Sequence, residues 1–107
     1  MANITNLGSN RLIALTGASN TLQNNVAPFT VISVSHGSAT TLTIPESTTV
    51  DYGVGTVLFV VQIGAGAVTA AKTGSDTITG TVATAAAGDT LILTKTADTA
   101  WHSALAT

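Results

Sequence analysis

The stretch that decides the fold class is residues 53–69, GVGTVLFVVQIGAGAVT. Its centre, residues 57–61 (VLFVV), is the longest unbroken apolar run of the chain, and glycines flank it on both sides. β-Branched and aromatic residues between glycines are typical of a β-strand. Alternation assigns Val57, Phe59, Val61 and Ile63 to one face and Leu58, Val60 and Gln62 to the other. Because both faces are mainly apolar, we expect both to be covered, one by the domain core and the other by a second layer or another copy of the chain.

The chain carries unusually few charges. Only 7% of its 107 residues are charged and the formal net charge is −2, whereas soluble domains average about 25% charged residues. Either hydroxyl and amide side chains hydrate the surface, or an assembly buries much of it, since charged residues are depleted from interface cores. The composition favours assembly.

The charge pattern and the apolar pattern exclude several kinds of partner. The basic residues Arg11, Lys72 and Lys95 are far apart in the sequence, so we expect no nucleic-acid partner, which would need clustered basic side chains. The central apolar run stops at Gln62, far short of the roughly 20 residues of a membrane-spanning helix, and we expect no membrane partner. The chain has no cysteine and no basic, apolar leader, which predicts synthesis in the cytoplasm and no disulfide.

Short apolar alternations recur along the whole chain. We expect eight or so short strands from nine candidate stretches, which are residues 11–15, 28–35, 39–44, 57–63, 67–71, 75–79, 81–84, 89–95 and 101–105. Residues 28–35 and 39–44 predict a hairpin, and residues 16–27 predict a loop. Even spacing without a long helix indicates an all-β fold, which we interpret as an antiparallel, jelly-roll-like β-sandwich. Residues 1–10 form an expected N-terminal arm, and residues 11–107 a single domain.

Residues able to do chemistry are present but do not form a recognisable constellation. His36 and His102 lack further ligands at metal spacing, and no serine lies in a Gly-x-Ser-x-Gly turn. The carboxylates are most simply turn-capping groups; they are Glu46, Asp51, Asp76, Asp89 and Asp98. A calcium site built from Asp76, Asp89 and Asp98 is an alternative that we disfavour, because calcium takes six to eight oxygen ligands, usually from several acids close in sequence. We therefore expect a protein that is not an enzyme and holds no cofactor or metal.

Two glycine and aromatic features have competing interpretations. Gly64-Ala65-Gly66 resembles part of a dinucleotide-binding loop, but we interpret it as a tight bend between two strands, with glycine supplying positive φ. Tyr52 and Trp101 lie beside predicted turns and could contact a glycan together with His36. For Trp101 we favour a core position, because aromatic side chains dominate core packing.

A series of short motifs spans residues 28–105. It runs Leu42-Thr43-Ile44-Pro45, Val54-Gly55-Thr56, residues 60–69 (VVQIGAGAVT), residues 74–80, Gly88-Asp89-Thr90 and Thr99-Ala100-Trp101. In this order the motifs resemble a β-rich module of tailed-bacteriophage virion proteins, especially tail fibres and other appendages. In those proteins the module usually sits inside a longer chain, so its occurrence behind a short arm favours a small accessory protein. The resemblance implies no catalytic residues.

The resemblance implies a structural role in a virion. We expect a self-associating decoration or cement protein, a homotrimer attached to the outside of the capsid, with the major capsid protein or another virion protein as partner. Similar-sized phage proteins pin an N-terminal arm to the shell, which makes the arm a candidate docking element: Ala2, Asn3, Ile4, Thr5, Asn6 and Leu7. The alternative is a tail-fibre or receptor-binding module that recognises host glycan through Tyr52, His36 or Trp101.

Overall fold

The computed structural model describes residues 12–22, 29–46 and 52–107, and within them it is built from strands. The strands are β1 (Leu12–Leu15), β2 (Ser19–Thr21), β3 (Phe29–Val34), β4 (Thr40–Ile44), β5 (Val57–Gln62), β6 (Val68–Lys72), β7 (Thr77–Gly80), β8 (Thr90–Ala97) and β9 (Ala100–Ala106). The all-β prediction is confirmed. The expected arm at residues 1–10 lies outside the described residues.

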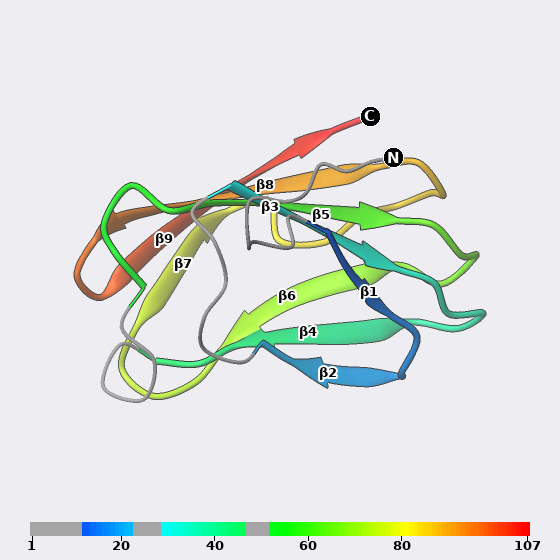
Figure 1. The fold of residues 1–107 in the computed structure, drawn as a ribbon, viewed down its shortest axis with the longest axis horizontal. Coiled ribbons are helices and arrows are strands. Elements are labelled where there is room, and N and C mark those ends of the chain that lie inside the picture. The colour runs from blue at the N-terminus through cyan, green and yellow to red at the C-terminus, as the bar shows by residue number, and fades with distance from the viewer. Residues whose placement is uncertain (1–11, 23–28, 47–51) are drawn as a thin grey trace, which may run out of the picture.

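The strands form two sheets that face each other across the core (Figure 1). The large sheet has the order β1-β3-β5-β8-β9-β7, and the small sheet has the order β2-β4-β6. From β1 to β6 the chain alternates between the two sheets. It therefore winds through three turns, which we call rungs: β1 with β2, β3 with β4, and β5 with β6.

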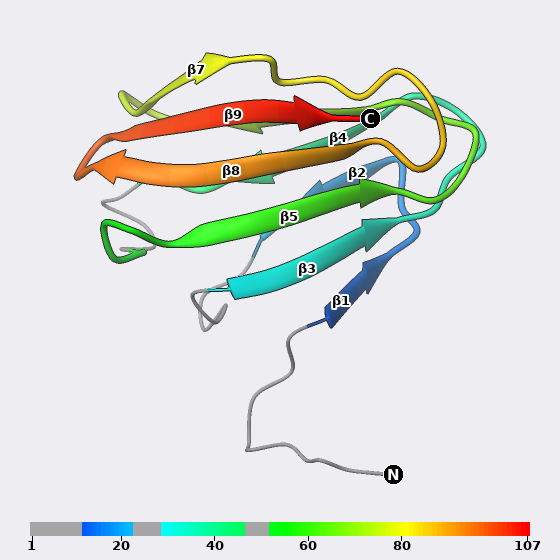
Figure 2. The same cartoon turned by 90° about the horizontal axis from the view of Figure 1, so that it is seen from above.

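Successive rungs stack in parallel. In the large sheet β1 pairs with β3 and β3 with β5, and in the small sheet β2 pairs with β4 and β4 with β6, all in parallel register. Strands β8 and β9 then extend the large sheet beyond β5 as an antiparallel pair, and β7 joins the far side of β9 in parallel (Figure 2). After β7, Ala83 forms an isolated antiparallel bridge with Thr69, so the segment around Ala83 lies alongside β6.

The predicted antiparallel pairing holds only for β5 with β8 and β8 with β9; the other strand pairs are parallel, so the jelly-roll-like arrangement is wrong. The predicted hairpin at residues 28–44 is also wrong. β3 and β4 are consecutive strands of different sheets, so the segment between them crosses the core edge instead of folding back. Either arrangement satisfies the alternation, because the inward side chains of both strands reach the same core. The predicted loop at residues 16–27 also contains β2, whose Ser-Asn-Thr sequence has no apolar signal.

The core lies between the two sheets and is formed by one side of each strand. Its fully buried members include Ile32, Leu42, Leu58, Val60 and Leu91. These positions follow the period of two that strands impose on side-chain direction. Alternation therefore grouped Leu58, Val60 and Gln62 on one face correctly, and the structure shows that this face is the inner one.

Gly64 and Gly66 serve a different purpose from the one we expected. The described glycines with positive φ are Gly55, Gly74, Gly80 and Gly88, and the two glycines of the bend are not among them. Instead, the turn after β5 stacks on the turn after β3. A Cβ on Gly66 would lie 1.8 Å from the carbonyl oxygen of Ser38. The bend needs glycine because two rungs approach backbone to backbone, and the positive-φ explanation is wrong.

Candidate interaction surface

The outer side of the large sheet presents three rows of side chains that run across the strands. The central row is continuous in register: Leu12 opposite Val31, Val31 opposite Phe59, Phe59 opposite Ile92, and Ile92 opposite Ala104. All of its members are apolar. Neighbouring strands lie about 4.8 Å apart, so this row makes a band across five strands.

The two flanking rows are also free of formal charge. One row holds Phe29, Val57, Thr94, His102 and Thr79. The other holds Ala14, Ser33, Val61, Thr90 and Ala106. We call the three rows together the outer face. Among the described residues it contains no Asp, Glu, Lys or Arg, and His102 is its one titratable side chain.

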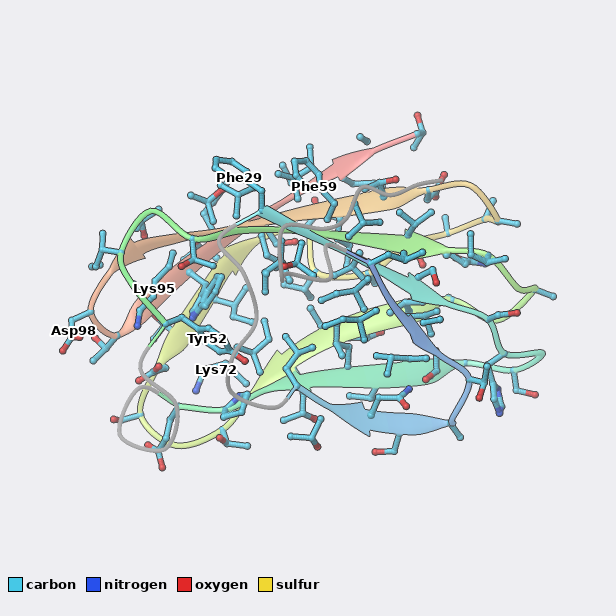
Figure 3. All side chains as sticks on the ribbon, in the orientation of Figure 1. Phe29, Tyr52, Phe59, Lys72, Lys95 and Asp98 are labelled. Carbon is cyan, nitrogen blue, oxygen red and sulfur yellow. The ribbon has the colours of Figure 1, made fainter. Side chains whose placement is uncertain are left out.

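Large apolar side chains on this face are accessible. Leu12 is 59% exposed, Phe29 57% and Val31 36%. Phe59, Val57, Val61 and Ile92 are partly exposed. Phe29 and Phe59 project away from the core on the same side of the sheet (Figure 3). The sequence predicted a second covered face on β5, and within the described residues no second layer lies over it.

The outer side of the small sheet is chemically different. Ser19, Thr41 and Thr69 are registered partners there, as are Thr21, Thr43 and Ala71. Hydroxyl groups at most of these positions can hydrogen-bond to water. The two outer sides of the molecule therefore divide into a hydroxyl-rich side suited to solvent and an apolar side suited to a partner.

The aromatic residues proposed for glycan binding are inside the protein. Trp101 is 1% exposed and Tyr52 is 6% exposed. Their rings pack edge to face, with centroids 5.9 Å apart and planes at 79°. The core interpretation of Trp101 is confirmed, and neither ring offers an open stacking platform. Burial also raises the pKa of Tyr52 to about 12, because the phenolate would lose hydration.

His36 lies far from these rings. It sits in the turn after β3, where the backbone N–H of Ser38 donates to its Nδ1 at 3.2 Å. Trp101 lies near the start of β9, which by the antiparallel register of β5, β8 and β9 is the opposite end of the large sheet. The structure therefore does not bring the three candidate glycan contacts together.

The described carboxylates either accept hydrogen bonds from backbone N–H groups of turns or lie too far from one another to share a metal ion. The Asp89 carboxylate accepts hydrogen bonds from the backbone N–H groups of Ala85 (2.9 Å) and Ala86 (3.0 Å), as a capping group should. The Glu46 carboxylate accepts from the N–H of Ser75. Asp51 lies outside the described residues. Within the described ranges no group of three His, Asp or Glu side chains is placed to hold a metal ion, so Asp76, Asp89 and Asp98 do not form the weakly indicated calcium site.

Two groups of buried polar residues were not identified from the sequence. Lys95 is 1% exposed, and its ammonium group donates to the carbonyl oxygen of Tyr52 at 2.6 Å; both lie at the same end of the molecule (Figure 3). Gln62 accepts a hydrogen bond from the hydroxyl of Thr84 at 2.5 Å, and the same hydroxyl accepts from the N–H of Val68 at 2.8 Å. Alternation could have placed Lys95 and Gln62 inside, but not found their partners.

Comparison with known proteins assigns neither a family nor a function to this chain. No protein family, curated protein or solved structure matches this chain. Among the described residues there is no helix long and apolar enough to cross a membrane. The outer face of the large sheet is therefore the candidate functional site, on geometry and chemistry alone.

Proposed function

We propose that this protein is a self-associating structural protein of a tailed-bacteriophage virion, a homotrimer that decorates the outside of the capsid. The observation that carries the self-association is the central apolar row, from Leu12 to Ala104, on a face without formal charge. The virion assignment is supported by the motif resemblance across residues 28–105. The burial of Trp101 and Tyr52 favours this function over glycan recognition.

The occupant of the outer face is best explained as further copies of this chain. A partner surface must supply apolar groups and no uncompensated charge, because an unpaired buried charge is costly. The chain itself offers such a surface, with only 7% charged residues. Fully burying a large apolar side chain contributes about 1.5–3 kcal/mol. Leu12, Phe29 and Val31 are about half exposed, so covering all three contributes roughly 3 kcal/mol per copy.

The decrease in side-chain size from β3 and β5 towards β9 favours three copies over two, although the large Leu12 on the edge strand β1 does not follow this trend. Six strands make a face about 24 Å wide. If three such faces surround a threefold axis, the middle of each face lies roughly 7 Å from the axis. Less space remains for side chains at the edges, where neighbouring faces meet. Phe29 and Phe59 lie on β3 and β5, towards the middle, whereas Ala104 and Ala106 lie on β9, towards one edge. A face-to-face pair would instead leave an even gap of about 10 Å and favour uniform sizes.

Light scattering after size-exclusion chromatography tests the self-association. We expect the protein to run at three times its monomer mass. Val31→Lys should place a charge in the apolar row and shift the mass to that of a monomer. The matched control is Thr69→Lys, on the hydroxyl-rich side, which should keep the trimer mass. Monomeric wild-type protein at high micromolar concentration would refute the self-association.

Capsid attachment needs a separate experiment. Labelled protein is offered to purified capsid shells lacking it and, in parallel, to host cells. We expect saturable binding to shells at a fixed ratio to capsid subunits, with cells left unlabelled. Deletion of residues 2–10 should abolish shell binding and leave the circular dichroism spectrum unchanged. Labelled cells and bare shells would instead support the receptor-binding alternative.

A further inference from the structure

His102 is the one titratable side chain among the described residues of the outer face. It lies on β9, between Thr94 of β8 and Thr79 of β7. Its Nδ1 is 3.2 Å from the hydroxyl oxygen of Thr79. The ring also lies close to the backbone of β7, because a Cβ on Gly80 would be 2.9 Å from its Cε1. The imidazole is therefore held against the sheet, and it is exposed when the chain is a single copy.

The side chains that face His102 from the two neighbouring strands are threonines and carry no charge. The charged residues of these strands and their connections lie elsewhere. Lys95 on β8 and Asp76, which precedes β7, are buried. Asp98 lies in the turn between β8 and β9, at one end of the molecule (Figure 3). Within the described ranges, a protonated His102 would thus have no carboxylate beside it on the outer face.

Covering the outer face changes the free energy of protonating this imidazole. A protonated imidazole is hydrated on an exposed sheet, and it loses that water when another copy covers the face. The covering copy brings the same outer face, whose described residues supply apolar and hydroxyl groups and no formal charge. An unpaired charge enclosed in such a contact is costly. Neutral His102 is therefore compatible with assembly, whereas the charged form opposes it.

We propose that His102 makes the self-association sensitive to pH: copies assemble while its imidazole is neutral and separate when it takes up a proton. The inference rests on the proposed self-association and adds its regulation. Histidine is the side chain that usually changes charge between pH 5 and pH 8. Because assembly of protonated copies must release protons, the association weakens as the pH falls. Each imidazole that has to be neutral lowers the association constant by up to about tenfold per pH unit, so three copies lower it by up to about 10³-fold.

Sedimentation equilibrium at a series of pH values from 8 to 5.5 measures this dependence, and circular dichroism at each pH checks the fold. We expect the wild-type association constant to fall by at least about 100-fold across the series. His102→Gln keeps a neutral, hydrogen-bonding side chain, so the ratio of its association constants at the two ends should be close to one. His102→Lys is charged throughout and should associate weakly at both ends. The matched control is His36→Gln, in the turn after β3 and outside the outer face, which should keep the wild-type pH dependence.

The outcomes separate this inference from the self-association itself. Wild-type protein that associates equally strongly at both ends of the series would overturn the pH sensitivity and leave the self-association standing. The same conclusion follows if His102→Gln keeps the pH dependence, if His36→Gln loses it, or if His102→Lys assembles as strongly as wild type at pH 8. Loss of the folded spectrum at pH 5.5 would attribute the dissociation to unfolding and would also overturn the inference. Monomeric wild-type protein at every pH would refute both proposals.

Discussion

Replacing Gly66 with alanine tests the stacking of rungs that defines this fold. Gly66 is buried in the turn after β5, and its N–H donates to the carbonyl oxygen of His36 at 2.8 Å. An alanine Cβ would lie 1.8 Å from the Ser38 oxygen, whereas real Cβ contacts are essentially never under 3.0 Å. The atoms that this Cβ would meet are the backbone O, C and N of Ser38. The two turns must therefore move apart, since no side chain can rotate away.

The expected cost follows from the contacts that this separation disturbs. Two backbone hydrogen bonds tie the turns together, from Gly66 to His36 and from Thr40 to Ala67. Each contributes about 1 kcal/mol net, and overpacking a close-packed site costs about 1–3 kcal/mol. We expect a loss of about 3 kcal/mol in the free energy of unfolding. For a domain of this size that lowers the melting temperature by roughly 15 °C.

Urea unfolding, followed by the fluorescence of the single tryptophan, measures this loss. Trp101 is buried and should report loss of the core. All variants are compared at one protein concentration, because self-association shifts apparent stability. The control is Gly37→Ala in the neighbouring turn, where a Cβ meets nothing within 4 Å. It should be neutral or stabilise by up to about 1 kcal/mol. Equal stability of the two variants, within about 0.5 kcal/mol, would refute the stacking argument.

Two further stability predictions concern buried polar groups. Thr84→Val should cost about 2–4 kcal/mol in the same urea assay, because it leaves the Oε1 atom of Gln62 and the N–H of Val68 unpaired in the core. Thr69→Val on the exposed side should stay within about 0.5 kcal/mol of wild type. Stability should also fall between pH 10 and pH 12, since the unfolded tyrosine ionises near 10.0 whereas burial keeps Tyr52 protonated up to about 12 in the folded protein. Thermal melts across this pH range should show a markedly smaller decline for Tyr52→Phe, and an identical decline in both proteins would contradict the assignment.

The candidate surface was partly visible in the sequence. Alternation around Phe59 showed that β5 has two apolar faces, and the low charge indicated a covered surface. The continuous row of five strands was not visible, because it depends on the register that places Val31, Phe59 and Ile92 side by side. The interior position of Trp101 was expected, but its edge contact with Tyr52 joins residues 49 positions apart (101 − 52), and no local pattern encodes it.

By itself the sequence determined that the chain is all-β and how the side chains of each strand divide between its two faces. The physical reason is local: successive side chains of a strand point to opposite sides, so apolar alternation reports burial directly. Only the tertiary structure decided which strands are neighbours. A turn such as residues 35–39 can fold a strand back or carry it to the facing sheet with the same residues inside. The parallel rungs depend instead on contacts between distant segments, including the backbone approach of Gly66 to Ser38.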